Sequence, residues 1–257
     1  MIDPRTSIIS NRLSKINRII AVSSGKGGVG KSMVATTLAL SLTMNGCKVG
    51  LFDLDFTSPS THVILGAQDL QPTEEKGLIP PTIHGLEYMS LIYFVGDNPA
   101  PLRGADVSNA LIELLAITQW GTLDFLVIDM PPGIGDAILD LIRFIGRIEF
   151  LIVTTPSLLA FETVKKQVAL LCDQKMHIIG VVENMKQDKA RGVESETCNL
   201  GLKFLGDIPF DSQIETAIGN SSLLLETAVG KKISQIARTN ILAEKKKAYY
   251  GLQSNDF

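Results

Sequence analysis

The chain has 257 residues, of which 45% are hydrophobic, 20% charged and 6% aromatic, and its formal net charge is −3. This charge gives no basic field that would favour nucleic acid, and no apolar stretch approaches the roughly 18 residues needed to span a bilayer. Three scattered cysteines, Cys47, Cys172 and Cys198, are too few for a disulfide framework, so we expect a cytoplasmic protein with no nucleic-acid or membrane partner.

The N-terminal half begins with a polar segment and then follows a strand–helix–strand pattern. Residues 1–17 are mixed and polar, and we expect a surface arm ahead of a single domain formed by residues 18–257. Residues 18–24 are a β-branched run that ends at glycines, which is typical of a buried strand. Residues 31–45 carry apolar side chains at helical spacing, and 48–55 read as a strand that finishes in two aspartates.

The rest of the chain continues to alternate between strand and helix patterns. The predicted strands are 86–91, 123–129, 149–155, 177–184 and 203–210, and the predicted helices are 107–117, 137–145, 160–172 and 231–247. Residues 66–105 are otherwise rich in proline and glycine and hard to assign, and the polar stretch 186–200 is expected to be a mobile surface loop. The alternation predicts an α/β fold with a doubly wound, mostly parallel sheet and helices on both faces.

The junction between the first strand and the first helix carries a phosphate-binding pattern. Gly25, Gly30, Lys31 and Ser32 match G-x-x-x-x-G-K-S/T. Glycines allow backbone N–H groups to turn toward phosphate oxygens, and the helix N-terminus favours the same anion. We expect Lys31 to neutralise the β- and γ-phosphates of ATP and Ser32 to ligate Mg²⁺, the alternative being a glycine-rich turn without a ligand. The predicted nucleotide contacts here are Gly25, Gly27, Gly28, Val29, Gly30, Lys31, Ser32 and Met33.

Aspartates stand at the ends of two predicted strands, where ligands bind in such sheets. Asp129 follows the apolar run FLVI and fits a Walker B carboxylate that holds Mg²⁺. Asp53 and Asp55 are two residues apart and so point to one side of the pleat. We expect Asp53 to support Mg²⁺, Asp55 to orient the attacking water and the Gly133 N–H to contact the γ-phosphate. The alternative for each aspartate alone is a helix or turn cap.

The segment KGGVGKS at residues 26–32 resembles the phosphate loop KGGxGKS/T of the MinD/Mrp group of P-loop ATPases. In that group the first lysine reaches across a dimer to the partner's nucleotide. The resemblance therefore implies a homodimer, or a heterodimer with a paralogue, that hydrolyses ATP slowly. It implies that Lys26 stabilises the transferred phosphoryl group as an arginine finger would. The alternative for Lys26 is a solvated loop lysine.

Within that group the likeness is strongest to the Mrp (ApbC) branch, whose members carry or assemble iron–sulfur clusters. It covers about residues 18–230 and includes DLDFTSPS (53–60), GVVENM (180–185) and FLGDIPFD (204–211). By this resemblance Asn184 hydrogen-bonds the adenine and the segment around Pro209 packs near the base. A turn cap at a strand end is the alternative for Asn184.

One departure concerns the cluster ligands. The Mrp branch places a C-x-x-C pair shortly after ENM, whereas residues 186–201 here contain only Cys198. A dimer would then offer two thiolates from this loop rather than the four that a 4Fe–4S cluster takes. Either a partner supplies ligands or the ATPase holds no cluster, and an ordinary loop cysteine is the alternative for Cys198.

Three classes of function follow from these patterns. The first is a nucleotide-switched dimeric ATPase that builds or loads an iron–sulfur or other metallocentre on a metalloprotein client. The second is a MinD- or ParA-type spatial organiser, but residues 243–257 lack a strong apolar face for a membrane and the net charge of −3 promises no DNA-binding patch. The third is a small-molecule kinase or ligase, with a second-substrate pocket in residues 66–105.

Overall fold

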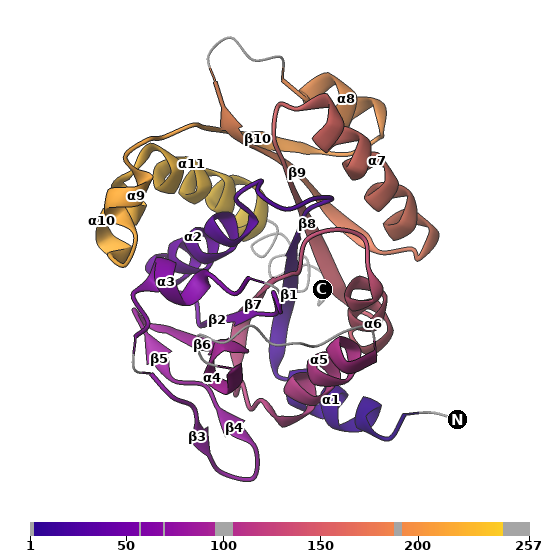
Figure 1. The fold of residues 1–257 in the computed structure, drawn as a ribbon, viewed down its shortest axis with the longest axis vertical. Helices are drawn as coiled ribbons and strands as arrows, with labels where there is room; N and C mark the ends of the chain where they lie inside the picture. Colours follow the sequence, from indigo (N-terminus) through magenta and orange to yellow (C-terminus); the bar gives the residue numbers. More distant parts are fainter. Residues whose placement is uncertain (1–2, 57, 69, 96–104, 188–191, 244–257) are drawn as a thin grey trace, which may run out of the picture.

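An eight-stranded sheet forms the centre of the computed structural model, which describes residues 3–56, 58–68, 70–95, 105–187 and 192–243 (Figure 1). The strand order is β10-β9-β8-β1-β7-β2-β6-β5. The strands of this sheet are β1 (Ile16–Ser23), β2 (Val49–Asp53), β5 (Thr82–Ile83), β6 (Leu86–Ser90), β7 (Leu123–Asp129), β8 (Ile148–Thr154), β9 (His177–Lys186) and β10 (Phe204–Pro209). All pairings are parallel except that of β5 with β6, and β3 (Thr73–Glu74) and β4 (Leu78–Ile79) form a separate antiparallel pair.

Helices cover both faces of the sheet, as Figure 1 shows. One face carries α1 (Arg5–Leu13), α5 (Ala105–Ile117), α6 (Asp136–Phe144) and α7 (Leu158–Asp173). The other carries α2 (Lys31–Met44), α3 (Thr61–Leu65), α10 (Ser221–Glu226), α11 (Ala228–Ile236) and a π-helical turn (Ala237–Leu242). The remaining short helices are α4 (Ile92–Val95), α8 (Glu194–Asn199) and α9 (Ile214–Ala217). The predicted doubly wound, mostly parallel α/β fold is confirmed.

The central strands are apolar on both faces because each face packs against helices. In β1, Ile19 and Ala21 belong to the core shared with α1, α5, α6 and α7, whereas Ile20 and Val22 belong to the core shared with α2 and α11. The parallel pairing of β7 with β1 and β2 places the carboxyl ends of these three strands side by side. In register, Asp129 of β7 pairs with Asp53 of β2 and with Val22 of β1.

Three expectations from the sequence are wrong in detail. Residues 1–17 are not a surface arm, because α1 buries Ile9 and Leu13 in the core and β1 already begins at Ile16. The stretch 186–200 contains α8 and buries Thr197, while residues 188–191 lie outside the described part. The helix predicted for 231–247 begins earlier, at Ala228, and changes to π-helical hydrogen bonding at Ala237.

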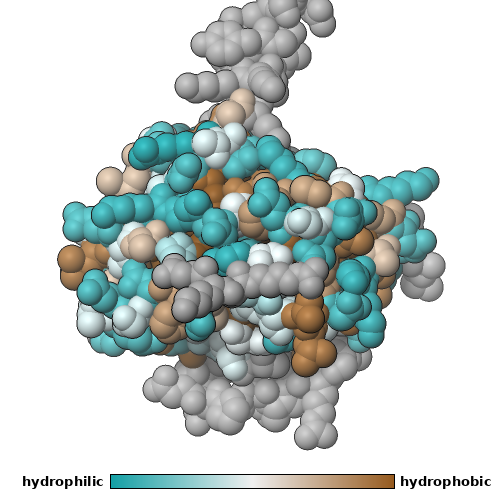
Figure 2. All heavy atoms as spheres, turned by 90° about the horizontal axis from the view of Figure 1, so that it is seen from above, coloured by the Kyte–Doolittle hydropathy of each residue, from teal (hydrophilic) through white to brown (hydrophobic). Residues whose placement is uncertain are grey.

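Two observations concern membranes and the polarity of one face of the molecule. No helix among the described residues is both long and apolar enough to cross a membrane. Seen from above relative to Figure 1, the surface is mainly hydrophilic and its hydrophobic side chains are scattered among polar ones (Figure 2).

Candidate functional site

The loop between β1 and α2 is held in place by two close approaches that require glycine. A Cβ on Gly25 would lie 2.2 Å from Thr163 Oγ1 of α7, and a Cβ on Gly30 would lie 2.3 Å from the Asn184 amide nitrogen. Gly30 also has φ of 79°, in the left-handed region, directly before the first residue of α2. The loop is thereby clamped between α7 and the end of β9, with the N-terminus of α2 facing the space above it.

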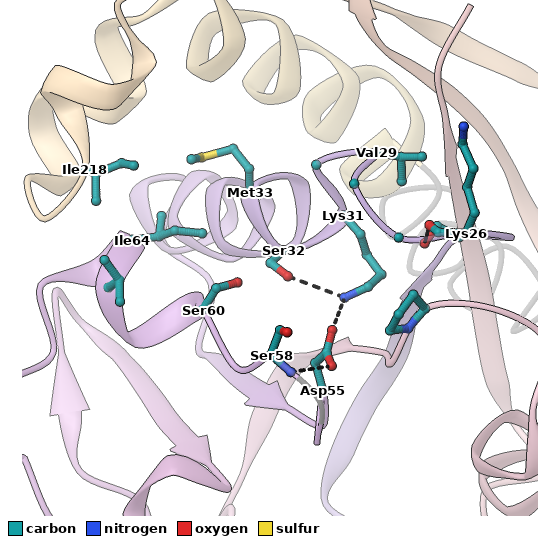
Figure 3. Close-up of a pocket in the computed structure, with 16 residues that line it drawn as sticks. Lys26, Val29, Lys31, Ser32, Met33, Asp55, Ser58, Ser60, Ile64 and Ile218 are labelled. Carbon is teal, nitrogen blue, oxygen red and sulfur yellow. Dashed lines mark hydrogen bonds and ion pairs between the residues drawn. The ribbon is translucent and has the colours of Figure 1, made fainter. Parts of the chain in front are cut away.

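A cavity of about 490 Å³ opens at this loop. Its lining residues are Ser24, Lys26, Gly27, Gly28, Val29, Gly30, Lys31, Ser32, Met33, Asp55, Ser58, Ser60, Val63, Ile64, Pro132 and Ile218. In Figure 3, Lys31, Ser32, Asp55, Ser58 and Ser60 form a polar part, and Met33, Ile64 and Ile218 lie together at the other end. A ligand with an anionic end and an apolar end suits such a cavity.

Lys31 sits between two carboxylates. Its Nζ lies 2.6 Å from Asp129 Oδ1 and 3.7 Å from Asp55 Oδ2, and it also lies 3.4 Å from Ser32 Oγ. The Lys31 side chain is only 6% exposed and the Asp129 side chain 0%. The ammonium therefore compensates two carboxylates that would otherwise be buried near each other without a cation.

Asp129 offers one carboxylate oxygen to a further ligand. Within the described part of the chain, Asp129 Oδ2 has no hydrogen-bond partner. Burial raises the pKa of the Asp129 carboxyl to about 7; Lys31 opposes this rise, while Asp53 adds to it. No group of three His, Cys, Asp or Glu side chains among the described residues is arranged to hold a metal ion. Mg²⁺ binds through one or two carboxylates together with phosphate oxygens and water, so Asp129 and Ser32 suit it only alongside a bound phosphate.

Asp53 connects the two ends of the segment that follows β2. Its Oδ1 accepts a hydrogen bond from the Asp55 N–H at 3.1 Å, and its Oδ2 accepts from Thr61 Oγ1 at 2.6 Å and the Thr61 N–H at 3.3 Å. Burial raises the pKa of Asp53, and these hydrogen bonds oppose the rise. Both carboxylate oxygens of Asp53 therefore already accept hydrogen bonds from protein groups. The predicted support of Mg²⁺ by Asp53 stays a prediction.

Asp55 lines the cavity beside Lys31, and its predicted role of orienting the attacking water stays a prediction. Its Oδ1 accepts a hydrogen bond from the Ser58 N–H at 3.1 Å, and its Oδ2 is the oxygen nearest Lys31. The carboxylate is therefore fixed by the next turn of its own loop and points toward the phosphate-binding end (Figure 3).

Lys26 is among the residues that line the cavity, but its side chain does not point toward the polar part of the cavity (Figure 3). In Figure 3 its side chain is directed away from Lys31 and Asp55. None of the ion pairs within the described ranges involves Lys26. The predicted role of Lys26 toward a partner's nucleotide stays a prediction.

Four of the predicted nucleotide contacts are not among the residues that line the cavity: Gly25, Gly133, Asn184 and Pro209. The Gly133 N–H donates to the Ser24 carbonyl at 3.0 Å, and the Asn184 amide donates to the Val29 carbonyl at 2.9 Å. Pro209 is exposed at the end of β10 and does not line the cavity. Asn184 thus stabilises the phosphate loop through its hydrogen bond to Val29. The roles predicted for Gly133, Asn184 and Pro209 toward ATP stay predictions.

Several residues at this site went unrecognised in the sequence. Ser58 and Ser60 follow the two aspartates closely, so their position gave a usable signal. Val63 and Ile218 gave no such signal, because the fold alone brings their segments to the same cavity. The residues next to them, Ile64 and Gly219, are more than 150 positions apart, and the Gly219 N–H donates to the Ile64 carbonyl at 3.1 Å.

The cysteines lie away from this cavity. Cys198 is exposed on α8, Cys172 is exposed on α7, and Cys47 is partly buried after α2. Cys198 is thus accessible, but among the described residues it belongs to no group of three or more His, Cys, Asp or Glu side chains that could hold a metal ion.

A strand, a glycine-rich loop, a helix beginning with Lys-Ser and carboxylates on neighbouring strand ends define a P-loop NTPase. The solved structures agree. A nucleotide-binding protein from Archaeoglobus fulgidus, in complex with ADP, superposes with a TM-score of 0.75 at 30% identity, covering 88% of this chain and 95% of that chain.

The chain belongs to the family of NUBPL iron-transfer P-loop NTPases (ParA), whose model matches residues 15–243. The iron-sulfur cluster carrier protein of Pseudomonas fragi is 44% identical over 241 residues, which are 88% of this chain and 83% of that protein. The protein of the same name from Aquifex aeolicus is 39% identical over 215 residues, which are 77% of this chain but 59% of that protein. The predicted resemblance to the Mrp/ApbC branch is confirmed. The comparisons also favour the predicted class of iron–sulfur cluster carriers over that of MinD- or ParA-type spatial organisers.

Proposed function

We propose that this chain is a nucleotide-switched ATPase that carries an iron–sulfur cluster, or helps to assemble one, for a metalloprotein client. The observation that carries the proposal is the position of Lys31 between Asp129 and Asp55 in the cavity above the phosphate loop. The names of the relatives support the cluster as cargo.

Binding of a triphosphate would change the ion pairs among Lys31, Asp55 and Asp129. The β- and γ-phosphates carry more negative charge than a single carboxylate, so Lys31 would leave Asp129 and turn to them. Asp129 and Ser32 would then hold Mg²⁺, which when bound neutralises charge on the phosphate oxygens. Asp55, released from Lys31, would orient the attacking water, and the N–H groups at the start of α2 would stabilise charge on the phosphates.

The same edge of the sheet has the properties of a surface that meets a second copy of the chain. Ile134, Leu158 and Leu159 follow the carboxyl ends of β7 and β8 and are 40%, 64% and 77% exposed. Large apolar side chains exposed beside a binding site are typical of an interface. A partner placed there would bring its own Lys26 to this phosphate site, and the predicted dimer accounts for both features.

Mixing two inactive variants tests the contribution of Lys26 across the dimer. In a mixed dimer of Lys26→Ala and Asp55→Asn subunits, one site keeps its own Asp55 and receives Lys26 from the partner. We expect the mixture to hydrolyse ATP when neither variant does so alone. Failure to recover activity, with mixed dimers demonstrated, would contradict the role of Lys26 across the interface.

Cluster binding by Cys198 is tested by anaerobic reconstitution with iron and sulfide. The matched control is Cys172, which is also exposed but lies on a different helix. We expect bound iron and sulfide to fall in Cys198→Ala and to stay at the wild-type level in Cys172→Ala. Wild-type protein that hydrolyses ATP but binds no iron, alone or with a client, would refute the cargo and leave the ATPase standing.

A further inference from the structure

A chain of hydroxyl groups connects β6 to the segment that carries Asp55. Tyr88 on β6 and Thr61, the first residue of α3, are both completely buried. Thr61 Oγ1 lies 2.8 Å from the Tyr88 hydroxyl oxygen and 2.6 Å from Asp53 Oδ2. Tyr88 does not line the cavity, so it acts only through these neighbours.

The direction of these hydrogen bonds follows from counting protons. The Thr61 hydroxyl has a single hydrogen, and it donates that hydrogen to the Asp53 carboxylate. With that hydrogen directed to Asp53, Thr61 has only its oxygen lone pairs left for Tyr88, so the Tyr88 hydroxyl donates to Thr61 in this arrangement. The Ser90 side chain is a second hydrogen-bond partner of the Tyr88 hydroxyl. Burial raises the pKa of Tyr88 well above its ordinary value, which keeps its proton in place for this donation.

Asp53 passes this constraint on to Asp55. Its Oδ2 accepts from Thr61, and its Oδ1 accepts from the backbone N–H of Asp55 at 3.1 Å. The backbone at Asp55 is thus fixed by a carboxylate whose own orientation is set from the far side by Thr61 and Tyr88. Tyr88 is held in turn by the parallel pairing of β6 with β2, where it lies opposite Leu51.

We propose that Tyr88 is a positioning residue for ATP hydrolysis: its hydroxyl, through Thr61 and Asp53, holds Asp55 where it can orient the attacking water. The inference rests on the proposed ATPase function and adds to it a residue that touches neither nucleotide nor water. A hydroxyl that donates into a chain ending at a buried carboxylate is worth more than an isolated neutral hydrogen bond.

Tyr93, on the short helix α4 that follows β6, offers a matched control. Tyr93 packs edge-on against Tyr88, with ring centroids 5.9 Å apart and an interplanar angle of 72°. Its hydroxyl is also buried, but within the described part of the chain it has no hydrogen-bond partner. Tyr88→Phe and Tyr93→Phe thus remove the same atom from neighbouring rings, and only the first breaks the hydroxyl chain.

The first test compares steady-state kinetics. We expect Tyr88→Phe to lower kcat about tenfold, as the loss of one hydrogen bond that matters in the transition state would. We expect its KM and its affinity for ATP to stay at the wild-type values, and Tyr93→Phe to keep the wild-type kcat. Thr61→Val should lose kcat as Tyr88→Phe does, Thr61→Ser should recover most of that loss, and combining Tyr88→Phe with Thr61→Val should add little.

The second test needs no turnover. The N–H groups of Asp55 and Thr61 both donate to Asp53, so their hydrogen exchange reports on the same network. In the nucleotide-free protein we expect exchange at these two amides to be faster in Tyr88→Phe and unchanged in Tyr93→Phe.

The outcomes separate this inference from the proposed function. Wild-type kcat and wild-type exchange in Tyr88→Phe would overturn the positioning role while ATP hydrolysis stands. An equal loss of kcat in Tyr93→Phe would overturn it as well, because ring packing would then explain both variants. If the wild-type protein hydrolyses no ATP, the proposed function fails, and exchange at the two amides still decides whether Tyr88 fixes the loop.

Discussion

Replacing Gly25 by alanine tests whether the phosphate loop is clamped as described. A Cβ at this position would lie 2.2 Å from Thr163 Oγ1, 2.6 Å from Thr163 Cβ and 2.8 Å from the Thr163 carbonyl carbon. Carbon atoms in contact are normally about 3.5–4.0 Å apart. The loop or α7 must therefore move by close to an ångström, and the obstacle is partly backbone, which cannot rotate away.

The cost of this overpacking follows from the size of the clash. Extra methyl groups forced into packed regions typically cost about 1–3 kcal/mol. For a chain of this length, we expect Tm to fall by about 3–10 °C. A displaced loop also moves its N–H groups away from the phosphates, so affinity for ATP should fall as well.

Two further variants give the controls for this experiment. Gly27→Ala, in the same loop, meets nothing nearer than Pro132 Cβ at 3.9 Å, so its Tm should stay near the wild-type value. Thr163→Ala should not rescue Gly25→Ala, because the Cβ and carbonyl carbon of residue 163 remain. Thermal unfolding and ATP titration of all four proteins, wild type included, make the comparison. Equal Tm values for Gly25→Ala and Gly27→Ala would refute the clamp.

The remaining predictions concern catalysis and a distant ion pair. Asp55→Asn should bind ATP but lose most hydrolysis in a phosphate-release assay, and unchanged turnover would contradict its role with water. Lys26→Ala should lower turnover more than ATP affinity, while Lys31→Ala should lower the affinity itself, as calorimetry with ATP would measure. Arg18 donates to both carboxylate oxygens of Glu149 at 2.7 Å; although burial opposes the shift, these bonds hold the pKa of Glu149 below its ordinary 4.5. The carboxylate therefore stabilises the fold above that pH, and this contribution is lost as pH falls through the folded-state pKa. Glu149→Gln should lower the free energy of unfolding by about 1–3 kcal/mol at pH 7, with the difference vanishing in acid; a constant difference would contradict the pairing.

The elements that carry the phosphate site could be predicted because their signals are local. The β-branched run of β1, the glycines and Lys31–Ser32 are contiguous, and parallel strands bring Asp53 and Asp129 to one edge. Helix α1 escaped prediction because its residues are largely polar and its burial depends on Ile9 and Leu13 alone.

The finer structure of the site depends on partners that are far apart in sequence. The family resemblance assigns Asn184 to adenine, and the hydrogen bond that its amide donates to the Val29 carbonyl, 155 positions away, could not be predicted from the sequence. The Tyr88–Thr61 hydrogen bond likewise joins β6 to α3, and neither the sequence of β6 nor that of α3 predicts it. Side-chain hydrogen bonds of this kind are set by the three-dimensional packing and have no periodic signature.

Transfer of a cluster to a client under nucleotide control tests the proposed function most directly. Wild-type protein and Asp55→Asn, both reconstituted anaerobically with iron and sulfide, would be mixed with an apo iron–sulfur protein, and recovery of client activity would be followed with and without ATP. We predict that the wild type activates the client and that ATP changes the rate, while Asp55→Asn loses the ATP response. Failure of the loaded wild type to activate any apo client tested, or equal rates with and without ATP, would contradict the proposal.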